Sequence, residues 1–442
     1  MLVVAALMPA CGDGKEIGRG EAGQKSGSAV LFIGDGMGPG YVTAARLTLR
    51  GTRGRLRLDE IPYTAVMRNY ATDSPVTDSA AAASAMACGH KTANGVICQD
   101  ASAISGERDG RRLESIALWA KRRGMRVGIV TTTRVTHATP AAFFGTHNDR
   151  EEERDLARQA IDSPLDFIIG GGLRVFTPER IDSETWAVDD DEDLMATARE
   201  QGWVVVEDAA SLMQITTLEK PVLGLFADSH LPYEWDSGPD AGHDGGSDEP
   251  RSAPTLLQMT TWAIDRLLGS AEPFLLVVEA GRIDHAGHDN RARTAMHEVK
   301  ALDDSVGVAL DRLDPESTLV LVTADHETGG LVINGYPDEK DGIWGTYYSK
   351  WQDRTYTVLT FATGPGMGES SLESFDASED RRPSGVRLKS AAHTGMDVLL
   401  YGWGRGAEQV HGTVDNTAIY PLLRSHIEGT RPVRGDLINP PD

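Results

Sequence analysis

The sequence predicts an α/β fold with one large, mostly parallel central sheet sandwiched by helices. Short apolar, β-branched runs alternate with amphipathic stretches along the 442 residues, which is typical of parallel strands joined by crossover helices. The clearest helical patterns cover residues 111–124, 252–269 and 293–313. We expect strands at residues 28–33, 63–70, 125–132, 166–171, 203–207, 222–227, 273–280 and 317–324.

Composition and charge narrow the class of protein. Hydrophobic residues make up 40% of the chain and charged residues 25%, which is the balance of an ordinary globular protein. No internal apolar run approaches the length of a membrane-spanning helix. A net charge of −23 opposes binding to nucleic acid, because so acidic a surface repels a phosphate backbone. Any anionic ligand would need local positive charge.

The first residues resemble an export signal. Residues 2–8 are apolar, small residues follow them, and Cys11 stands where a bacterial lipoprotein carries its lipidated cysteine. Met8 and Pro9 depart from the usual lipobox, and no basic residue precedes the apolar run. We expect export to the periplasm or the cell surface, with Cys11 either lipidated as a membrane tether or removed with the leader. The alternative is a disordered tail.

The remaining chain divides into a large domain and a short tail. We assign residues 1–27 to the leader and tether, 28–430 to one domain and 431–442 to the tail. Residues 228–251 are acidic and rich in Gly and Pro, which predicts a surface insertion. Residues 328–390 mix polar turns with aromatic runs and predict a second insertion.

Two cysteines lie beyond the leader. Cys88 and Cys98 could form a disulfide in an oxidising compartment. Because Cys88 falls within an alanine-rich helical run, the interpretation that we favour is that it packs there as a small apolar residue.

Metal-ligand and catalytic residue types follow four of the predicted strands. In open parallel sheets, ligands bind beyond the carboxyl ends of the strands. We therefore expect the four segments to meet at one edge of the sheet. They are GDGMGPG (34–40), TTTRVTHATP (131–140), GRIDHAGHD (281–289) and DHETGG (325–330).

These segments carry the ligand types that zinc and magnesium prefer, namely imidazoles with carboxylates and oxygen donors. So many acids in one cleft would repel one another without a cation. GDGMGPG does not fit a dinucleotide-binding loop, because the sixth positions counted from Gly34 and Gly36 are Pro39 and Tyr41. Its glycines would instead leave space for an acid to reach a metal. The candidates are Asp35, Glu279, Asp284, His288, Asp325, His326 and His393.

A further segment, TDSAAAASAMACGHKT (77–92), places the hydroxyl of Ser79 at the start of a predicted helix. In one interpretation Ser79 is an N-cap, a contribution of about 1 kcal/mol that several other residue types could make. In the other it is a nucleophile, because free N–H groups and a partial positive charge at a helix start favour an incoming anion.

In this order and at these spacings, GDGMG, TDSAAAASAMACG, TTTRVTHATPA, VVEAGRIDHAGHD, TADHETGG and AAHTG resemble the signature segments of alkaline phosphatases. The resemblance covers roughly residues 28–425. It implies an alkaline-phosphatase-like fold and makes residues 28–430 a single catalytic domain.

The resemblance also implies two zinc ions and one magnesium ion. Asp35 would bridge the second zinc and the magnesium. The implied ligands are Asp284, His288 and His393 for the first zinc, Asp35, Asp325 and His326 for the second zinc, and Asp35, Thr139 and Glu279 for magnesium.

The implied reaction is hydrolysis of phosphate monoesters through a phosphoserine at Ser79, with release of inorganic phosphate. Coordination to zinc would lower the pKa of the serine hydroxyl and activate it. Arg150 would clamp the phosphoryl oxygens, His285 would contact phosphate through water, and His137 would tune the magnesium site without ligating the metal. We assign no role to His147, His230, His243, His297 and His411.

Several alternatives remain open. A phosphodiesterase or sulfatase of the same superfamily is the nearest enzymatic rival, although Ala80 and Ala81 do not fit the sulfatase nucleophile context. A lipid-tethered phosphate-binding protein without turnover is the rival from another class. The physiological monoester is open, as is the choice between a monomer and a homodimer.

Overall fold

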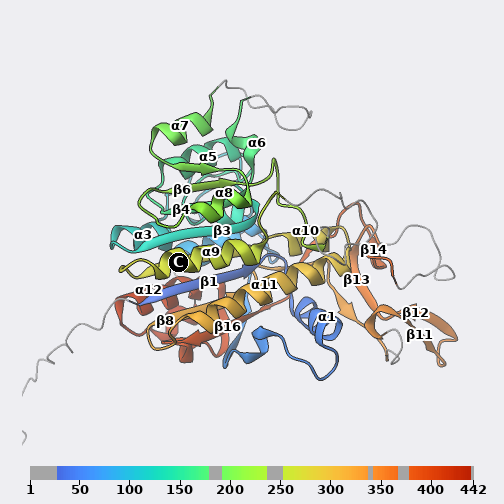
Figure 1. The fold of residues 1–442 in the computed structure, drawn as a ribbon. Helices are drawn as coiled ribbons and strands as arrows, with labels where there is room; N and C mark the ends of the chain where they lie inside the picture. Colours follow the sequence, from blue (N-terminus) through green and yellow to red (C-terminus); the bar gives the residue numbers. More distant parts are fainter. Residues whose placement is uncertain (1–26, 179–191, 236–251, 337–341, 367–377, 440–442) are drawn as a thin grey trace, which may run out of the picture.

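A ten-stranded sheet runs through the computed structural model and carries helices on both faces (Figure 1). The structure describes residues 27–178, 192–235, 252–336, 342–366 and 378–439. The strand order is β17-β2-β16-β8-β1-β7-β3-β4-β6-β5. The strands are β1 (Ser28–Gly34), β2 (Tyr63–Arg68), β3 (Arg126–Arg134), β4 (Phe167–Gly171), β5 (Val204–Val206), β6 (Val222–Leu225), β7 (Phe274–Ala280), β8 (Thr318–Thr323), β16 (Val398–Gly404) and β17 (Gly412–Asp415).

The eight predicted strands all belong to this sheet, so the predicted fold class is confirmed. β16 and β17 were not predicted. β16 pairs antiparallel with both of its neighbours, β2 and β8, whereas the other pairings of the sheet are parallel. Gly402 and Gly404 lower the strand propensity of β16, and β17 has only four residues, so neither gives a clear local signal.

Helices α9 and α11 cross the front of the sheet in Figure 1, whereas α2, α3 and α12 pack together on the opposite face. The three predicted helices correspond to α3, α9 and α11. The helices are α1 (Pro39–Arg50), α2 (Ser79–Cys88), α3 (Ile116–Arg122), α4 (Ala138–Ala141), α5 (Glu153–Asp162), α6 (Leu173–Phe176), α7 (Leu194–Glu200), α8 (Ala209–Gln214), α9 (Leu256–Leu268), α10 (Arg282–His288), α11 (Ala292–Arg312), α12 (Ile419–Glu428) and α13 (Arg434–Ile438).

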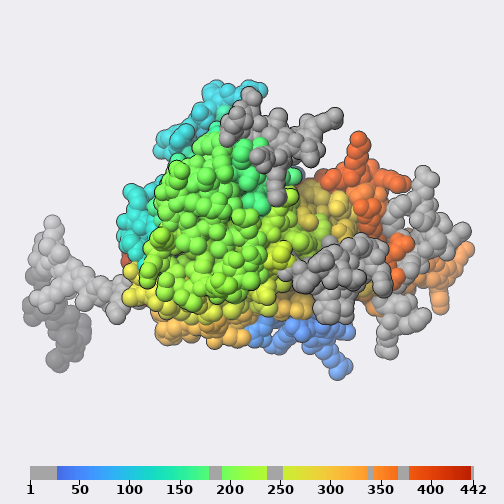
Figure 2. Space-filling model, turned by 45° about the horizontal axis from the view of Figure 1, so that its top comes forward, coloured from blue at the N-terminus to red at the C-terminus, as the bar shows by residue number. Residues whose placement is uncertain are grey.

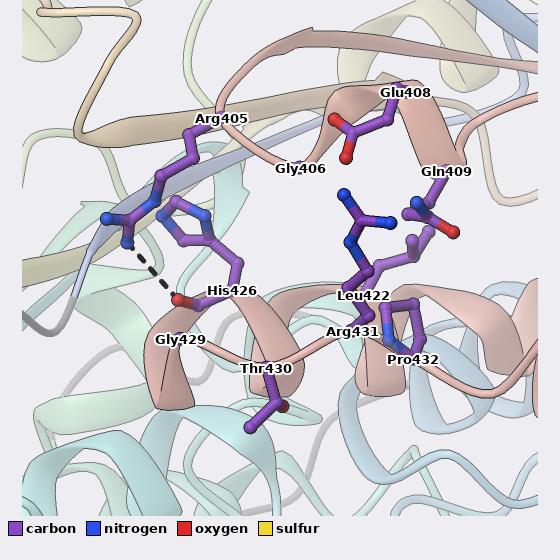
Figure 3. Close-up of a pocket in the computed structure, with 10 residues that line it drawn as sticks. All are labelled: Arg405, Gly406, Glu408, Gln409, Leu422, His426, Gly429, Thr430, Arg431 and Pro432. Atoms are coloured by element: carbon purple, nitrogen blue, oxygen red, sulfur yellow. Dashed lines mark hydrogen bonds between the residues drawn. The ribbon is translucent and has the colours of Figure 1, made fainter. Parts of the chain in front are cut away.

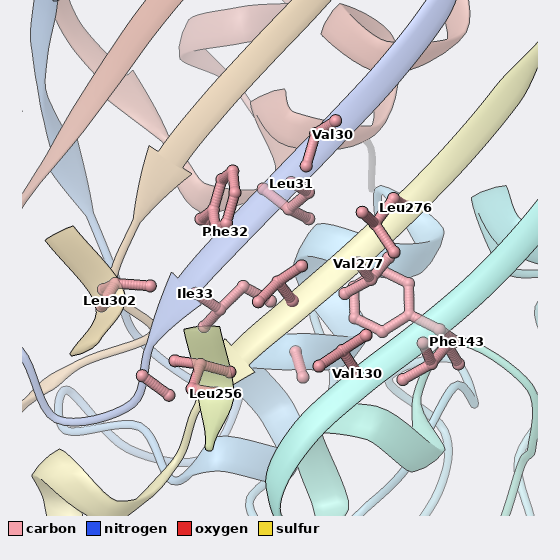
Figure 4. Close-up of a cluster of buried hydrophobic side chains, with 14 of the residues drawn as sticks. Val30, Leu31, Phe32, Ile33, Val130, Phe143, Leu256, Leu276, Val277 and Leu302 are labelled. Carbon is pink, nitrogen blue, oxygen red and sulfur yellow. The ribbon is translucent and has the colours of Figure 1, made fainter. Parts of the chain in front are cut away.

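The hydrophobic core lies on both faces of the central strands, as Figure 4 shows for Val30 to Ile33 and their neighbours. In β1, residues 29–33 are fully buried. Leu276 and Val277 of β7 lie beside them, and Leu302 of α11 approaches from the side. Strands buried on both faces cannot alternate polar and apolar residues, which explains the continuous apolar runs in the sequence.

The region expected as an insertion at 328–390, together with the residues that flank it, forms smaller β structure beside the main sheet. The strands are β9 (Glu327–Thr328) paired with β15 (His393–Thr394), the sheet of β10 (Val332–Ile333), β13 (Leu359–Gly364) and β14 (Ser384–Arg387), and the hairpin of β11 (Thr346–Ser349) and β12 (Arg354–Thr357). Figure 2 shows the orange-red part of this region projecting beside the main body.

The outer segments lie partly outside the described residues. These are residues 1–26 of the leader, including Cys11, and residues 236–251 of the other expected insertion. The expected tail contains α13, in which Leu437 is buried. Among the described helices, none has both the length and the apolar character that crossing a bilayer requires.

Candidate metal centre and active site

The four strands with ligand-bearing ends are neighbours in the sheet, in the order β8-β1-β7-β3. All three of their pairings are parallel, so their carboxyl ends point to the same edge. The predicted convergence of the four segments therefore follows directly from the topology. The candidate acids and histidines meet there in three overlapping groups.

Asp35 lies at the centre of the cluster, one residue beyond β1, and is fully buried. The chain turns directly after it at Gly36, whose φ is +72°. A Cβ at Gly36 would lie 2.8 Å from Cα of Asp284. Glycine is therefore required both for the left-handed backbone and for the close approach of the segment after β7.

The second predicted zinc group lies between β1 and β8. Nε2 of His326 lies 3.5 Å from Asp35 Oδ1 and 3.3 Å from Asp325 Oδ2, and all three residues are fully buried. The backbone N–H groups of Gly36 and His326 donate to the other oxygen of Asp325, at 3.1 and 2.9 Å. Ser79 Oγ lies 3.2 Å from Nε2 of His326. The serine hydroxyl thus lies beside this group.

The first predicted zinc group comes from α10 and β15. Asp284 and His288 are four residues apart on α10 and face the same side, with 3.2 Å between Oδ2 and Nε2. The pairing of β15 with β9 brings in His393, whose Nε2 lies 3.2 Å from Nε2 of His288 and 3.6 Å from Oδ1 of Asp284. Nδ1 of His288 donates to the carbonyl of Ala391, and Nδ1 of His393 donates to that of Thr77. These contacts direct both Nε2 atoms toward the shared site.

The predicted magnesium group lies between β1, β7 and α4. Asp35, Glu279 and His137 place one ligand atom each within 4.8 Å of one another. Thr131 and Thr133 donate to Oε2 of Glu279 and fix the carboxylate. Its other oxygen, Oε1, has no hydrogen-bond partner, and the same holds for the buried hydroxyl of Thr139.

The unpartnered atoms of the cluster fit bound cations. Both carboxylate oxygens of Asp35, Oδ2 of Asp325, Oε1 of Glu279 and Oγ1 of Thr139 are buried without a hydrogen-bond partner. Leaving so many acceptors unsatisfied is costly unless something positive lies between them. The donors are oxygen and imidazole groups, which suit zinc and magnesium.

The shifted pKa values of these groups also indicate a site for bound cations. Burial raises the pKa of Asp35 well above its usual range, and the neighbouring acids raise it further. Burial also raises the pKa of Glu279 and that of Asp325 to about 7. Burial lowers the pKa of His288, but Asp284 outweighs burial and brings that pKa to about 9. In the metal-free protein, protons therefore occupy positions that a cation would otherwise take.

Helix α2 presents Ser79 from its first residue, but Ser79 does not cap the helix. The N-cap is Asp78, whose Oδ1 accepts from the N–H of Ala81 at 2.9 Å. All ten residues of α2 are buried, so its small side chains let it pack closely on every side. The capping interpretation of Ser79 is therefore wrong, and its hydroxyl is free to face the cluster.

Arg150, the predicted phosphoryl clamp, contacts Asp78, the residue before Ser79. Its Nη1 donates to Oδ2 of Asp78 at 3.1 Å, and its Nη2 donates to Nε2 of His137 at 2.9 Å. A neutral imidazole that accepts at Nε2 carries its proton on Nδ1. Direct ligation of a metal by His137 would therefore require loss of the Arg150 contact.

His230, which had no predicted role, lies in the loop after β6. Its ring centroid is 4.3 Å from that of His285 and 5.7 Å from that of His137. Burial and the adjacent histidine and arginine charges lower its pKa, so its ring is neutral. The strand-end rule that selected the other candidates also applies to the residues after β6. The loop reaches β3, since the N–H of Leu231 donates to the carbonyl of Thr132.

A separate cavity of about 510 Å³ lies between the end of β16 and α12 (Figure 3). His426 in its wall contacts the carbonyl of Ser28, at the end of β1 opposite Asp35. Arg405, Glu408 and Arg431 also line it. Since it contains none of the predicted site residues, it is not where we place the chemistry.

Comparisons with known proteins identify the family. A family model described as alkaline phosphatase matches residues 28–428. The human tissue-nonspecific alkaline phosphatase is 31% identical over 437 residues, which are 87% of this chain and 80% of the human protein. A membrane-bound alkaline phosphatase of Bombyx mori is 30% identical over 443 residues, covering 88% and 77% of the two chains. The crystal structure of Thermus thermophilus alkaline phosphatase matches with a TM-score of 0.71, 28% identity and 92% coverage of each chain.

The fold and the comparisons together define a hydrolase of phosphate monoesters. The chain belongs to the alkaline phosphatase family, as its sequence motifs predicted. The family is metal-dependent, and the buried donor groups described above are candidate metal ligands in this member.

Proposed function

We propose that this chain hydrolyses phosphate monoesters through a phosphoserine formed on Ser79. The observation that carries the proposal is the position of Ser79 Oγ, 3.2 Å from Nε2 of His326 at the edge of the buried donor cluster. A serine hydroxyl is a weak nucleophile unless a base or a cation activates it. No other role in the described contacts accounts for a buried serine at this position, because Asp78 already caps the helix.

We assign three cation sites to the donor groups. Asp35 belongs to two of them, because its oxygens face both His326 and the Glu279 group. When bound, these cations would neutralise the buried acids, lower the pKa of the Ser79 hydroxyl and stabilise the charge on the leaving oxygen. The assigned ligands are Asp284, His288 and His393 for one zinc, Asp35, Asp325 and His326 for a second zinc, and Asp35, Thr139 and Glu279 for magnesium.

The chain's own residues then carry the two half-reactions. Ser79 loses its proton to solvent and its Oγ bonds to phosphorus, while the ester bond breaks and the leaving oxygen takes a proton from solvent to give the alcohol. Water from the solvent then breaks the bond between Oγ and phosphorus, and inorganic phosphate leaves. Arg150 holds two phosphoryl oxygens, because its planar guanidinium donates in parallel and is already oriented by Asp78.

Two histidines support the phosphoryl site without bonding to phosphorus. His137 accepts from Arg150 and thereby fixes the plane of the guanidinium. His285 accepts at Nδ1 from Arg282, so its proton lies on Nε2 and can be donated to phosphate through a water molecule. Burial lowers the pKa of His285 to about 3, so it acts as a neutral donor.

A direct assay separates this function from its rivals. With zinc and magnesium supplied, we expect kcat/KM for p-nitrophenyl phosphate to exceed that for bis(p-nitrophenyl) phosphate by about a hundredfold or more. We expect no measurable turnover of p-nitrophenyl sulfate. Faster turnover of the diester or the sulfate would show that another branch of the superfamily describes this chain. Tight binding of phosphate without turnover of any ester would identify a binding protein.

Substitution of Arg150 by alanine is expected to raise KM about 10- to 100-fold, with a smaller change in kcat. The reason is that the guanidinium binds phosphoryl oxygens in both the ground state and the transition state. Steady-state kinetics over a range of p-nitrophenyl phosphate concentrations measures both constants. Arg158→Ala on the outer side of α5 is the matched control and should leave both unchanged. A large loss confined to kcat would contradict the clamp.

The location and assembly of the protein extend the proposal. The apolar leader and Cys11 favour export with either a lipid tether or simple cleavage, and a relative from Bombyx mori is named as membrane-bound. We also propose that residues 28–430 form one catalytic domain. A homodimer and a monomer are both compatible with the described residues.

A further inference from the structure

The sulfur atoms of Cys88 and Cys98 lie 2.7 Å apart in the interior of the protein. Both residues are buried, with 4% and 0% of their surfaces exposed. This separation is well inside the contact distance of two unbonded sulfurs, so a small side-chain adjustment would bring the pair to bonding distance. We propose that Cys88 and Cys98 form a disulfide that fastens the helix carrying Ser79 to the loop that supports Arg150.

The pair joins the end of α2 to the loop that returns along it. Cys88 is the last residue of α2, and Ser79 is the first. The N–H of Cys98 donates to Ser84 Oγ at 2.8 Å, so the loop already lies against the middle of the helix. Cys98 has a φ of +46°, a left-handed conformation that a residue with a side chain rarely adopts. The backbone thus accepts strain at the residue whose sulfur meets Cys88.

The loop between the two cysteines supports the phosphoryl site. The N–H of Gly95 donates to Oδ2 of Asp78 at 3.0 Å, and Oδ1 of Asn94 accepts from the N–H of Asp78 at 2.7 Å. The carbonyl of Gly95 accepts from the N–H of Arg150 at 2.8 Å. A bond between Cys88 and Cys98 would close this loop at its base and reduce the freedom of the residues that hold Asp78 and Arg150.

Formation of the bond needs an oxidant, which we assign to the class of disulfide donors such as an oxidised dithiol protein or oxidised glutathione. The thiolate of one cysteine attacks the donor disulfide, forms a mixed disulfide and releases one donor thiol. The second cysteine then attacks the protein sulfur of that mixed disulfide and releases the other donor thiol. Two electrons and two protons pass to the donor, and the cysteine pair is oxidised.

The expected export of the protein and a cavity beside Cys88 both favour formation of the disulfide. Disulfides persist in extracellular and periplasmic compartments, to which the leader of this chain is expected to direct it. Cys88 also lines a cavity of about 380 Å³ together with Tyr420 and Arg424, so it is the cysteine of the pair that a donor disulfide can approach.

The test is a thiol measurement on the full chain purified from an oxidising compartment without reductant. The protein is denatured in the presence of N-ethylmaleimide, digested and mapped by mass spectrometry. We expect the peptides of Cys88 and Cys98 to remain joined and unalkylated until a reductant is added. Alkylation of both residues in protein that was never reduced would overturn the proposal, as would a bond from either residue to Cys11.

A second measurement keeps the proposal falsifiable if one variant folds poorly. We expect dithiothreitol to lower Tm of the wild type by about 3 to 8 °C and to leave Tm of Cys98→Ser unchanged. The double variant Cys88→Ala with Cys98→Ala should behave like Cys98→Ser. An equal response of wild type and variants to the reductant would contradict a bridge. Neither measurement depends on turnover, so the disulfide can fail while the proposed function stands.

Discussion

Replacement of Ser79 by alanine should reduce kcat for p-nitrophenyl phosphate by about 10³-fold or more. The hydroxyl is the group that bonds to phosphorus, so its loss removes the covalent path and leaves only the electrostatic environment of the site. The fold should survive, because Asp78 caps α2 and alanine suits a fully buried helix. Steady-state kinetics and a thermal unfolding curve on the same preparation measure the two effects.

Ser84→Ala is the matched control for this experiment. Ser84 lies in the same buried helix, and its hydroxyl contacts the backbone at Val96 and Cys98 instead of the donor cluster. We expect Ser84→Ala to lose some stability and to retain turnover. Trapping provides an independent check, since quenching the reaction at low pH should leave phosphate on Ser79. A label on another residue, or unchanged turnover in Ser79→Ala, would remove the nucleophile assignment.

Removal of the metals should abolish turnover and lower Tm by about 10 °C or more. The buried oxygens of Asp35, Glu279 and Asp325 would then lack their counter-charges, and their mutual repulsion favours unfolding. Dialysis against EDTA followed by calorimetry measures the change, and restored zinc and magnesium should reverse it. Full activity after verified metal loss would refute the metal assignment.

The contribution of Glu279 and Asp325 to the stability of the metal-free protein should fall as pH rises. Burial raises the folded-state pKa of Glu279 from 4.5, and that of Asp325 from 3.8, to about 7. Between these limits the folded state holds protons that the unfolded state has released, so each rise in pH favours unfolding. The loss is on the order of 3 kcal/mol per carboxyl and levels off above about pH 7.

Neutral variants provide the control for this pH dependence. Glu279→Gln and Asp325→Asn cannot ionise, so in EDTA each variant should gain Tm relative to the wild type as pH rises from 4.5 to 7. The stabilisation by added metal should be smallest at low pH in the wild type, because protons and cations compete for the same oxygens. Parallel changes of Tm with pH in the metal-free wild type and in both neutral variants would contradict the buried acid cluster.

Local patterns were enough to predict most of the fold. The apolar runs of β1, β3, β7 and β8 are continuous because these strands are buried on both faces, and such runs are visible in any single sequence. The strand-end rule then pointed to the segments that carry Asp35 and Glu279. β16 escaped notice because its glycines weaken the pattern and its antiparallel direction comes from its pairing with β2 and β8.

The sequence by itself determined the family, the eight parallel strands and the identity of the donor side chains, since each depends on residue types within a short window. Only the tertiary structure decided which atoms meet. In the structure the N–H of Gly36 donates to Asp325, 289 residues away in the sequence, and Asp78 caps the helix that begins at Ser79. His230 lies against His137, which contacts Arg150. The physical reason is that hydrophobic burial selects strands locally, whereas distances between charged atoms are set only when the strands pack side by side.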